Sequence, residues 1–174
     1  MPLPEDCDLL VVGSGAGGLS AAVTAAFHGL RVIVAEKEPV FGGTTAWSGG
    51  WIWAPLNPLA RRAGIIEDPD APRMYLRHVL GNNFDAPRID AFLAAAPEMV
   101  AFHEAHTALK FEGGNRICDT YGTLPGAGTG GRSVIAAPYD ARNLGPLHSS
   151  SRSSRFVTVE HAGGRYGESA SRGR

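Results

Sequence analysis

A glycine-rich turn between two apolar segments constrains the fold of this 174-residue chain more than any other feature. Residues 9–12 read LLVV, residues 19–27 are rich in alanine, and residues 32–35 read VIVA. Short continuous apolar runs are typical of parallel strands buried on both faces, and the segment between them predicts a helix that Gly29 ends. Residues 9–35 therefore predict a βαβ unit, the beginning of an α/β fold in which helices flank a parallel sheet.

The turn between the first strand and the helix carries the motif G-x-G-x-x-G. Gly13 allows a tight turn, Gly15 lets a pyrophosphate approach the backbone, and Gly18 lets the helix pack closely on the strand. The N–H groups at the start of the helix attract phosphate, and the carboxylate of Glu36 can accept hydrogen bonds from both hydroxyls of a ribose. A glycine-rich turn without a ligand is the alternative. The predicted dinucleotide site contains Gly13, Ser14, Gly15, Ala16, Gly17, Gly18 and Glu36.

A stretch with two glycine pairs, GGTTAWSGG at residues 42–50, follows in a long loop after Glu36. Its glycines let the chain pass close to a flat ring, and its hydroxyls offer hydrogen bonds to phosphate or ring atoms. Its backbone N–H groups suit the N5 and O4 atoms of a flavin. A nicotinamide enzyme would usually continue into another helix, so NAD is the less favoured alternative. The candidate residues are Gly42, Gly43, Thr44, Thr45, Ser48, Gly49 and Gly50.

The segments DLLVVGSGAGG and VIVAEKEPVFGGTTAWSGGWIW resemble the FAD-binding half of the fumarate reductase/succinate dehydrogenase flavoprotein family. Within that family they are most similar to 3-ketosteroid 1-dehydrogenases and related FAD-dependent oxidoreductases. The resemblance implies FAD, a Rossmann-like domain, and dehydrogenation or reduction of a carbon–carbon bond next to a ketone. It implies a steroid-like ketone as the substrate, with a fumarate-like acid as the runner-up. It also adds Lys37 to the cofactor-binding candidates.

A second segment, CDTYGTLPGAGTGGRS, resembles the part of the ketosteroid dehydrogenases in which an aspartate-tyrosine element precedes a proline-glycine loop. The resemblance implies that a tyrosine here lines the substrate pocket, and Tyr121 is the candidate catalytic residue. Thr120 interrupts the adjacent pair, so the residues themselves favour a structural role for Tyr121 over a place in the pocket. Arg132 is expected to form a local ion pair or to anchor the loop.

The middle of the chain predicts packing helices. Residues 57–63 predict a short helix, and residues 70–81 and 85–106 both open with Asp-Ala-Pro, a cap followed by proline in the first turn. Pro97 is expected to kink or divide the last of these helices. Short strands are expected at residues 115–118 and 133–136. The motif HEAH at residues 103–106 is one residue short of a zinc motif, which favours polar residues at a helix end over a metal site.

The composition changes at residue 147. Residues 147–174 contain seven serines and five arginines, and only Phe156–Val159 suits a strand. Two interpretations remain open: a disordered basic tail, or out-of-frame sequence after a reading-frame change, which we favour. Residues 5–146 are then part of an incomplete FAD-binding domain, and an FAD-binding fragment without catalysis is an alternative function.

The charge and cysteine content bear on partners and location. The formal net charge is −1, which gives no basis for a nucleic acid or an anionic membrane as partner. The apolar run at residues 9–35 contains five glycines, His28 and Arg31, which argues against a membrane span. Cys7 and Cys118 are expected to be free thiols in a reducing compartment, which favours the cytoplasm. The oligomeric state is left open.

Overall fold

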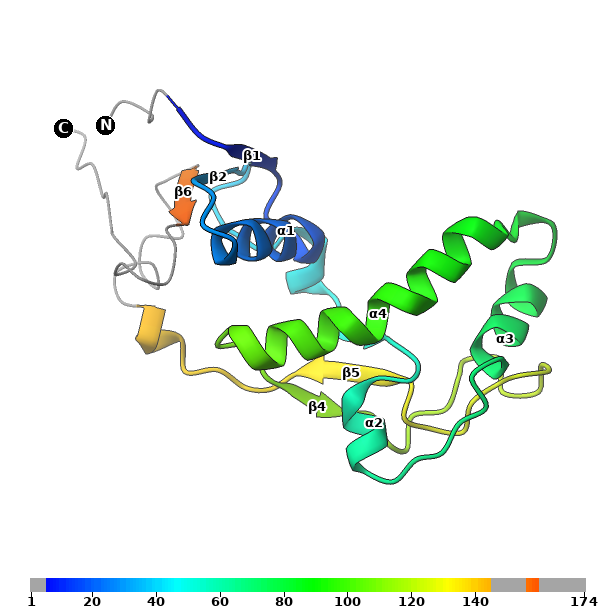
Figure 1. Cartoon of the computed structure of the whole chain (residues 1–174). Coiled ribbons are helices and arrows are strands. Elements are labelled where there is room, and N and C mark those ends of the chain that lie inside the picture. Colours follow the sequence, from blue (N-terminus) through cyan, green and yellow to red (C-terminus); the bar gives the residue numbers. More distant parts are fainter. Residues whose placement is uncertain (1–5, 145–155, 160–174) are drawn as a thin grey trace. The chain divides into compact units, whose positions relative to one another are not determined.

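The computed structural model of the chain describes residues 6–144 and 156–159, and it opens with the expected βαβ unit (Figure 1). Strands β1 (Leu9–Val12) and β2 (Val32–Ala35) pair in parallel. Helix α1 (Ala16–Phe27) connects them, and Gly29 with a φ of 84° follows its last turn. The predicted order, the parallel pair and the helix end are confirmed.

The chain divides into two compact units, which are described separately. The first unit belongs to residues 1–49 and 140–174, and the second unit to residues 50–139. In the sequence, the second unit is thus inserted between the two parts of the first unit.

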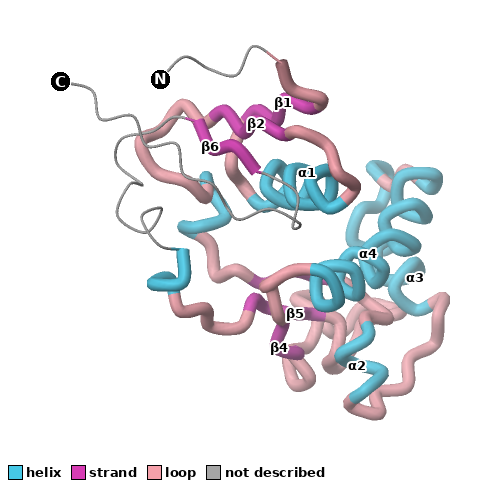
Figure 2. Tube along the Cα trace, turned by 60° about the vertical axis from the view of Figure 1, so that its left-hand side comes forward, coloured by secondary structure: helices cyan, strands magenta, loops and turns pink. Residues whose placement is uncertain are grey.

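In the first unit, α1 packs on the strands (Figure 2). The prediction that β1 is buried on both faces is wrong, because Leu10 is 55% exposed and Val12 is 82% exposed. In the described part of the sheet β1 lies at an edge, and side chains alternate between the faces of a strand, so α1 covers only every second residue. The buried core consists of Val11, Ala22, Ala26, Val32 and Val34.

A third strand makes the first sheet mixed. Strand β6 (Phe156–Val159) pairs antiparallel with β2, and the strand order is β1-β2-β6. Residues 156–159 are the part of the tail that suits a strand by sequence, and they form one here. Two 3₁₀ turns, η1 (Gly43–Trp47) and η3 (Ala141–Leu144), also belong to this unit.

The second unit contains an antiparallel sheet in the order β3-β5-β4. Its strands are β3 (Trp51–Trp53), β4 (Phe111–Gly113) and β5 (Ser133–Ala136). The strand at 133–136 is confirmed, whereas the one expected at 115–118 is wrong. The last hydrogen bond to β5 is donated by the N–H of Gly114 to the carbonyl of Ser133, and the chain then turns at residues 115–116. The core beneath helix α4 consists of Ala54, Ala96, Val100, Phe111 and Val134.

The predicted helices of the second unit are confirmed. They are α2 (Pro58–Arg62), α3 (Ala71–Leu80) and α4 (Ala86–His106), and η2 (Gly81–Asn83) joins the last two. Each of the three α-helices has proline in its first turn. Helix α4 is continuous through Pro97, so the proline does not divide it.

None of the helices in the described residues has both the length and the apolar character needed to cross a membrane. Cys7 is partly buried and Cys118 is exposed, and both are free thiols as expected.

Candidate functional site

The glycine-rich turn has a geometry that only glycine permits at its two ends. Gly13 has a φ of 97°, a conformation that side chains strongly disfavour. A Cβ atom at Gly18 would lie 2.0 Å from the carbonyl oxygen of Gly13 and 3.3 Å from Cγ1 of Val11. The close packing expected at Gly18 is therefore present, and it holds the start of α1 against the end of β1.

The glycines between these two ends leave the helix N-terminus bare. A Cβ atom at Gly17 would meet nothing within 4 Å, and one at Gly15 would meet only Oγ1 of Thr45, at 3.8 Å. The first N–H groups of a helix have no partner within the helix, and together with the helix dipole they favour a bound anion. The turn can therefore receive a phosphate close to its backbone.

Glu36 lies beside this turn, at the end of β2, and is buried. Its Oε2 accepts hydrogen bonds from the backbone N–H of Ser14 at 2.9 Å and from the Ser14 hydroxyl at 2.5 Å. Its Oε1 accepts one from the N–H of Glu38 at 3.0 Å. The Ser14 hydroxyl, followed by the backbone donors, lowers the pKa of Glu36 to about 2. The carboxylate is ionised at neutral pH, and Oε1, with fewer close donors than Oε2, is the oxygen with more acceptor capacity for a ligand hydroxyl.

The segment after Glu36 is fastened to the turn at two points. The N–H of Gly42 donates to the Ser14 hydroxyl at 3.0 Å, and the N–H of Ala16 donates to Oγ1 of Thr45 at 3.1 Å. The Thr45 oxygen thus occupies a position at the helix N-terminus that suits a phosphate oxygen.

This segment is more regular than the open loop that was expected. Residues 43–47 form the 3₁₀ turn η1, in which the N–H of Ala46 bonds to the carbonyl of Gly42, and the N–H of Ser48 bonds to that of Thr45. These two N–H groups are engaged within the turn rather than directed at a ligand ring.

The first unit brings most of the predicted cofactor residues together. The hydroxyl-bearing residues of the 42–50 segment are exposed, and Lys37 is exposed with its ammonium group 3.3 Å from Glu38. Gly50 belongs to the second unit, where it lies against Ile135. The residues that share the first unit are Gly13, Ser14, Gly15, Ala16, Gly17, Gly18, Glu36, Lys37, Gly42, Gly43, Thr44, Thr45, Ser48 and Gly49.

Tyr121, the candidate catalytic residue, belongs to the second unit. Its side chain is mostly exposed. Its backbone N–H donates to the phenol oxygen of Tyr75 at 3.2 Å, and Tyr75 is buried beside the indole ring of Trp53. The backbone at Tyr121 is thus anchored to the core while the phenol group faces outward.

A buried ion-pair network holds the loop that carries Tyr121. Arg132 is 2% exposed and lies 2.5 Å from Oδ2 of Asp119, and it also pairs with Glu67. Asp119 accepts further hydrogen bonds from the Trp53 indole at 2.7 Å and from the N–H of Gly128 at 2.8 Å. The ion pair expected of Arg132 is confirmed, but the partner Glu67 is distant in sequence and was not foreseen.

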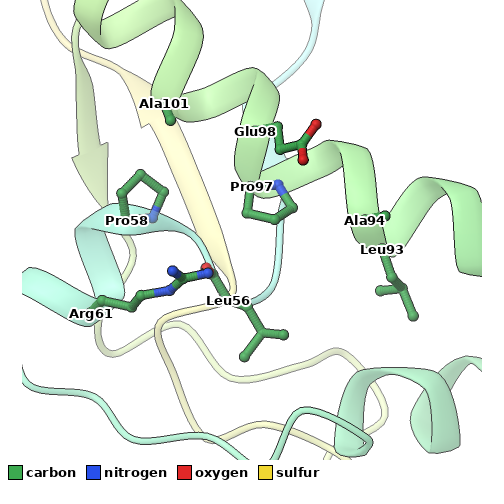
Figure 3. A pocket seen from close by; sticks show the side chains of 8 residues that line it. All are labelled: Leu56, Pro58, Arg61, Leu93, Ala94, Pro97, Glu98 and Ala101. Atoms are coloured by element: carbon green, nitrogen blue, oxygen red, sulfur yellow. The ribbon is translucent and has the colours of Figure 1, made fainter.

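The second unit contains a groove between α2 and α4 (Figure 3). Its volume is about 410 Å³, and Leu56, one of its lining residues, has a φ of 60°. The guanidinium group of Arg61 donates to the carbonyl of Leu56 at 3.0 Å. Arg61 and Glu98 are the charged residues of a lining that is otherwise apolar, and none of the lining residues belongs to the predicted site. The lining is formed by Leu56, Pro58, Arg61, Leu93, Ala94, Pro97, Glu98 and Ala101.

The HEAH segment forms the last turn of α4. His103 is buried, and burial lowers its pKa. The carboxylate of Glu104 lies 2.7 Å from the guanidinium of Arg62. Among residues 6–144 and 156–159 no group of three or more histidine, cysteine or acidic residues is arranged to hold a metal.

Known sequences are similar to this chain over most of its length. The family described as "FAD binding domain" matches residues 8–168. The 3-oxosteroid 1-dehydrogenase of Mycobacterium tuberculosis (strain ATCC 25618 / H37Rv) is 44% identical over 141 residues, which are 81% of this chain and 25% of that protein. The 4-oxocyclohex-2-ene-1-carboxylate 5-dehydrogenase of Sinomonas cyclohexanicum is 44% identical over 139 residues, 80% of this chain and 23% of that protein. The chain thus spans about a quarter of the length of these curated relatives.

One solved structure has a similar fold. The 3-ketosteroid delta1-dehydrogenase from Sterolibacterium denitrificans, in complex with 1,4-androstadiene-3,17-dione, matches with a TM-score of 0.77 and 38% identity. The match covers 83% of this chain and 25% of that chain.

Proposed function

The chain belongs to the family of FAD binding domains, and on that basis we propose that it forms the FAD-binding part of a dehydrogenase acting on a carbon–carbon bond next to a ketone. One observation carries the proposal. The bare glycine turn at Gly15 and Gly17 lies beside the ionised carboxylate of Glu36, so a phosphate-binding and a ribose-binding group are adjacent. This pair of groups fits the ADP half of FAD.

The residues of the first unit divide the proposed binding between them. The N–H groups at the start of α1 hold the pyrophosphate, and Oε1 of Glu36 accepts a hydrogen bond from the adenosine ribose. Thr44, Thr45 and Ser48 are exposed and are the proposed source of further hydrogen bonds. For this, the Thr45 hydroxyl must release the N–H of Ala16 or donate its own proton, and the Ser48 hydroxyl, which donates to the Thr45 carbonyl, must accept. FAD, when bound, supplies the hydride acceptor for the oxidation of the substrate.

The proposed substrate is a ketone in a six-membered ring, with steroid-like ketones first. The two relatives described above are named for an oxosteroid and for an oxocyclohexene carboxylate, and both names describe ring ketones. The phenol oxygen of Tyr121 is the proposed group that moves a proton at the carbon next to the ketone. Its exposure on an anchored loop supports this role, since the phenol group is open to a ligand.

FAD binding without turnover is a second candidate function. The observation that favours it is coverage, since the chain spans about a quarter of the length of the curated relatives.

In both candidates we assign the FAD-binding part to residues 5–146 and the location to the cytoplasm. The family match continues to residue 168, across the segment that contains β6. Sequencing the gene across this segment tests whether residues 147–174 are read in the frame of the preceding part.

Titration of the 174-residue chain with FAD tests the cofactor proposal. We expect flavin fluorescence to change on binding and the Tm to rise with FAD concentration, because a ligand of the native state stabilises it by about 2.7 kcal/mol at 100 times its Kd. A folded chain whose Tm and flavin signal do not respond to saturating FAD would refute the proposal.

Two glycine substitutions separate binding from folding. Gly15 has an ordinary extended φ of −66°, and its Cβ would make only a normal contact, so Gly15→Ala should fold. The added methyl group stands where the pyrophosphate must approach, and we expect at least tenfold weaker FAD binding. Gly122→Ala is the control, because its Cβ meets only the Asp119 carbonyl at 3.6 Å. Equal FAD affinity of the two variants would contradict the assignment of the turn.

Turnover is tested with the same chain. A 3-ketosteroid and a cyclohexanone carboxylate, each with an artificial electron acceptor, distinguish the two ring-ketone classes. A chain that binds FAD and oxidises neither compound supports the second candidate. If the Tyr121→Phe chain retains its activity, Tyr121 is not the group that transfers the proton.

A further inference from the structure

Ser14 is a buried polar residue at the point where three segments meet. It lies in the turn between β1 and α1, and its side chain is fully enclosed. Its hydroxyl donates to Oε2 of Glu36 at 2.5 Å, at the end of β2. The same oxygen accepts the N–H of Gly42 at 3.0 Å, at the start of the loop that contains η1. One hydroxyl thus joins the turn, the carboxylate and the loop.

The hydrogen bonds restrict the carboxylate of Glu36 to one orientation. Oε2 receives two donors, both from Ser14, whereas Oε1 receives one, from the N–H of Glu38. A carboxylate oxygen accepts about two hydrogen bonds, so Oε2 is saturated, whereas Oε1 has acceptor capacity left. Without the hydroxyl, backbone N–H groups alone would hold the carboxylate, and its plane would be less firmly fixed.

The contact between Ser14 and Glu36 is also strong. Hydrogen bonds to an ionised acceptor are shorter and about twice as strong as those between neutral groups. The Ser14 hydroxyl is the largest cause of the lowered pKa of Glu36, which shows that it favours the charged form that a ribose hydroxyl needs.

We infer that Ser14 is a positioning residue for cofactor recognition: its hydroxyl holds the Glu36 carboxylate so that Oε1 accepts a hydrogen bond from the adenosine ribose, while Ser14 itself does not contact the ribose. The inference rests on the proposed FAD binding. It assigns to Ser14 a role in selecting a ligand with a ribose diol, separate from the phosphate contacts of the glycine turn.

Two nucleotides distinguish this role from a structural one. ADP carries the ribose hydroxyls, and 2′,3′-dideoxy-ADP lacks them, while both carry the same phosphates and base. We expect the wild-type chain to prefer ADP by about tenfold, and Ser14→Ala to reduce that preference to about twofold or less. A general loosening of the turn or of the Gly42 contact would weaken both nucleotides equally and leave the ratio of their Kd values unchanged. Ser14→Thr keeps the hydroxyl and is expected to keep the preference.

The outcomes separate the inference from the proposed function. A wild-type chain that binds neither FAD nor ADP refutes both. A wild-type chain that binds FAD but does not distinguish the two nucleotides overturns the role of Ser14 alone, as does a Ser14→Ala chain that retains the preference.

The carbon-13 signal of the Glu36 carboxyl supplies a readout that is independent of ligand and also reports whether the variant is folded. In Ser14→Ala its pKa should rise from about 2 toward the ordinary value of 4.5. A titration that matches that of the wild-type chain would also overturn the inference.

Discussion

Replacing Gly18 by alanine should destabilise the first unit, whereas replacing its neighbour Gly17 should not. The Cβ of Gly18→Ala would lie 2.0 Å from the backbone oxygen of Gly13, and essentially no real Cβ contact is shorter than 3.0 Å. Either α1 or the turn must therefore move by about 1 Å. The obstacle is a backbone atom rather than a flexible side chain, so we expect a loss of stability of about 3 kcal/mol, the upper end of the range for overpacked cores. That loss is a large part of the free energy of unfolding of a typical domain, which is about 5–15 kcal/mol.

The neighbouring position provides a matched control. Gly17 is also in the first turn of α1, and its Cβ would meet nothing within 4 Å. Alanine at this position lowers the conformational entropy of the unfolded chain and clashes with nothing in the folded one. Gly17→Ala should therefore raise the stability by about 0.4–1 kcal/mol. The same chemical change at adjacent residues is thus expected to have opposite signs.

Amide hydrogen exchange resolves the effect by unit. A loss of about 3 kcal/mol corresponds to roughly 100-fold faster exchange of the α1 amides through unfolding of the first unit. The amides of α4, in the second unit, serve as the internal reference. Exchange in α1 that is unchanged by Gly18→Ala, or accelerated equally by Gly17→Ala, would refute the packing argument.

Three further predictions concern other contacts. The pKa of Glu36 is lowered to about 2 from 4.5, so its contribution to stability should be complete above pH 4.5 and lost as the pH falls toward 2. The free energy of unfolding of Glu36→Gln, measured in acid, should therefore change less steeply with pH in that window than that of the wild-type chain. Asp119→Ala deprives the buried Arg132 of one partner and should lower the stability of the second unit by about 3 kcal/mol in urea unfolding; an unchanged midpoint would show that the ion pair is dispensable. Asn57→Ala removes a buried cap of α2 and should lower the Tm, at a cost of about 2 kcal/mol, whereas Asn83→Ala at an exposed site should leave it unchanged.

Local stereochemistry explains what the sequence predicted well. The tight turn at Gly13 and the close packing at Gly18 depend on atoms within a few residues, so the motif was sufficient to predict them. The helices α3 and α4 were also predictable, because proline in the first turn acts locally. The predicted acidic cap is confirmed at Asp85, which accepts the N–H of Arg88, and is wrong at Asp70, whose side chain makes no cap hydrogen bond.

The errors arose where distant residues decide the outcome. The apolar pattern of β1 predicted burial on both faces, but exposure of Val12 depends on what covers the strand and not on the pattern itself. Strand β4 was expected four residues too late because its position depends on pairing with β5, about 20 residues further on. Glu67 was missed as a partner of Arg132 since no local signal connects two charges that lie 65 positions apart.

The pairing of β2 with β6 has a consequence for the order of folding. Strands β1 and β2 are in register at a separation of 23 residues, as Leu9 and Val32 are, whereas Ala35 and Phe156 are 121 residues apart. Closing the longer loop costs about 1.5 kcal/mol more in chain entropy, and contacts of high sequence separation form late. We expect β1, α1 and β2 to assemble first, which would complete the glycine turn before β6 joins the sheet. Pulse-labelled hydrogen exchange would show β2 amides facing β6 protected after those facing β1, and simultaneous protection would contradict this order.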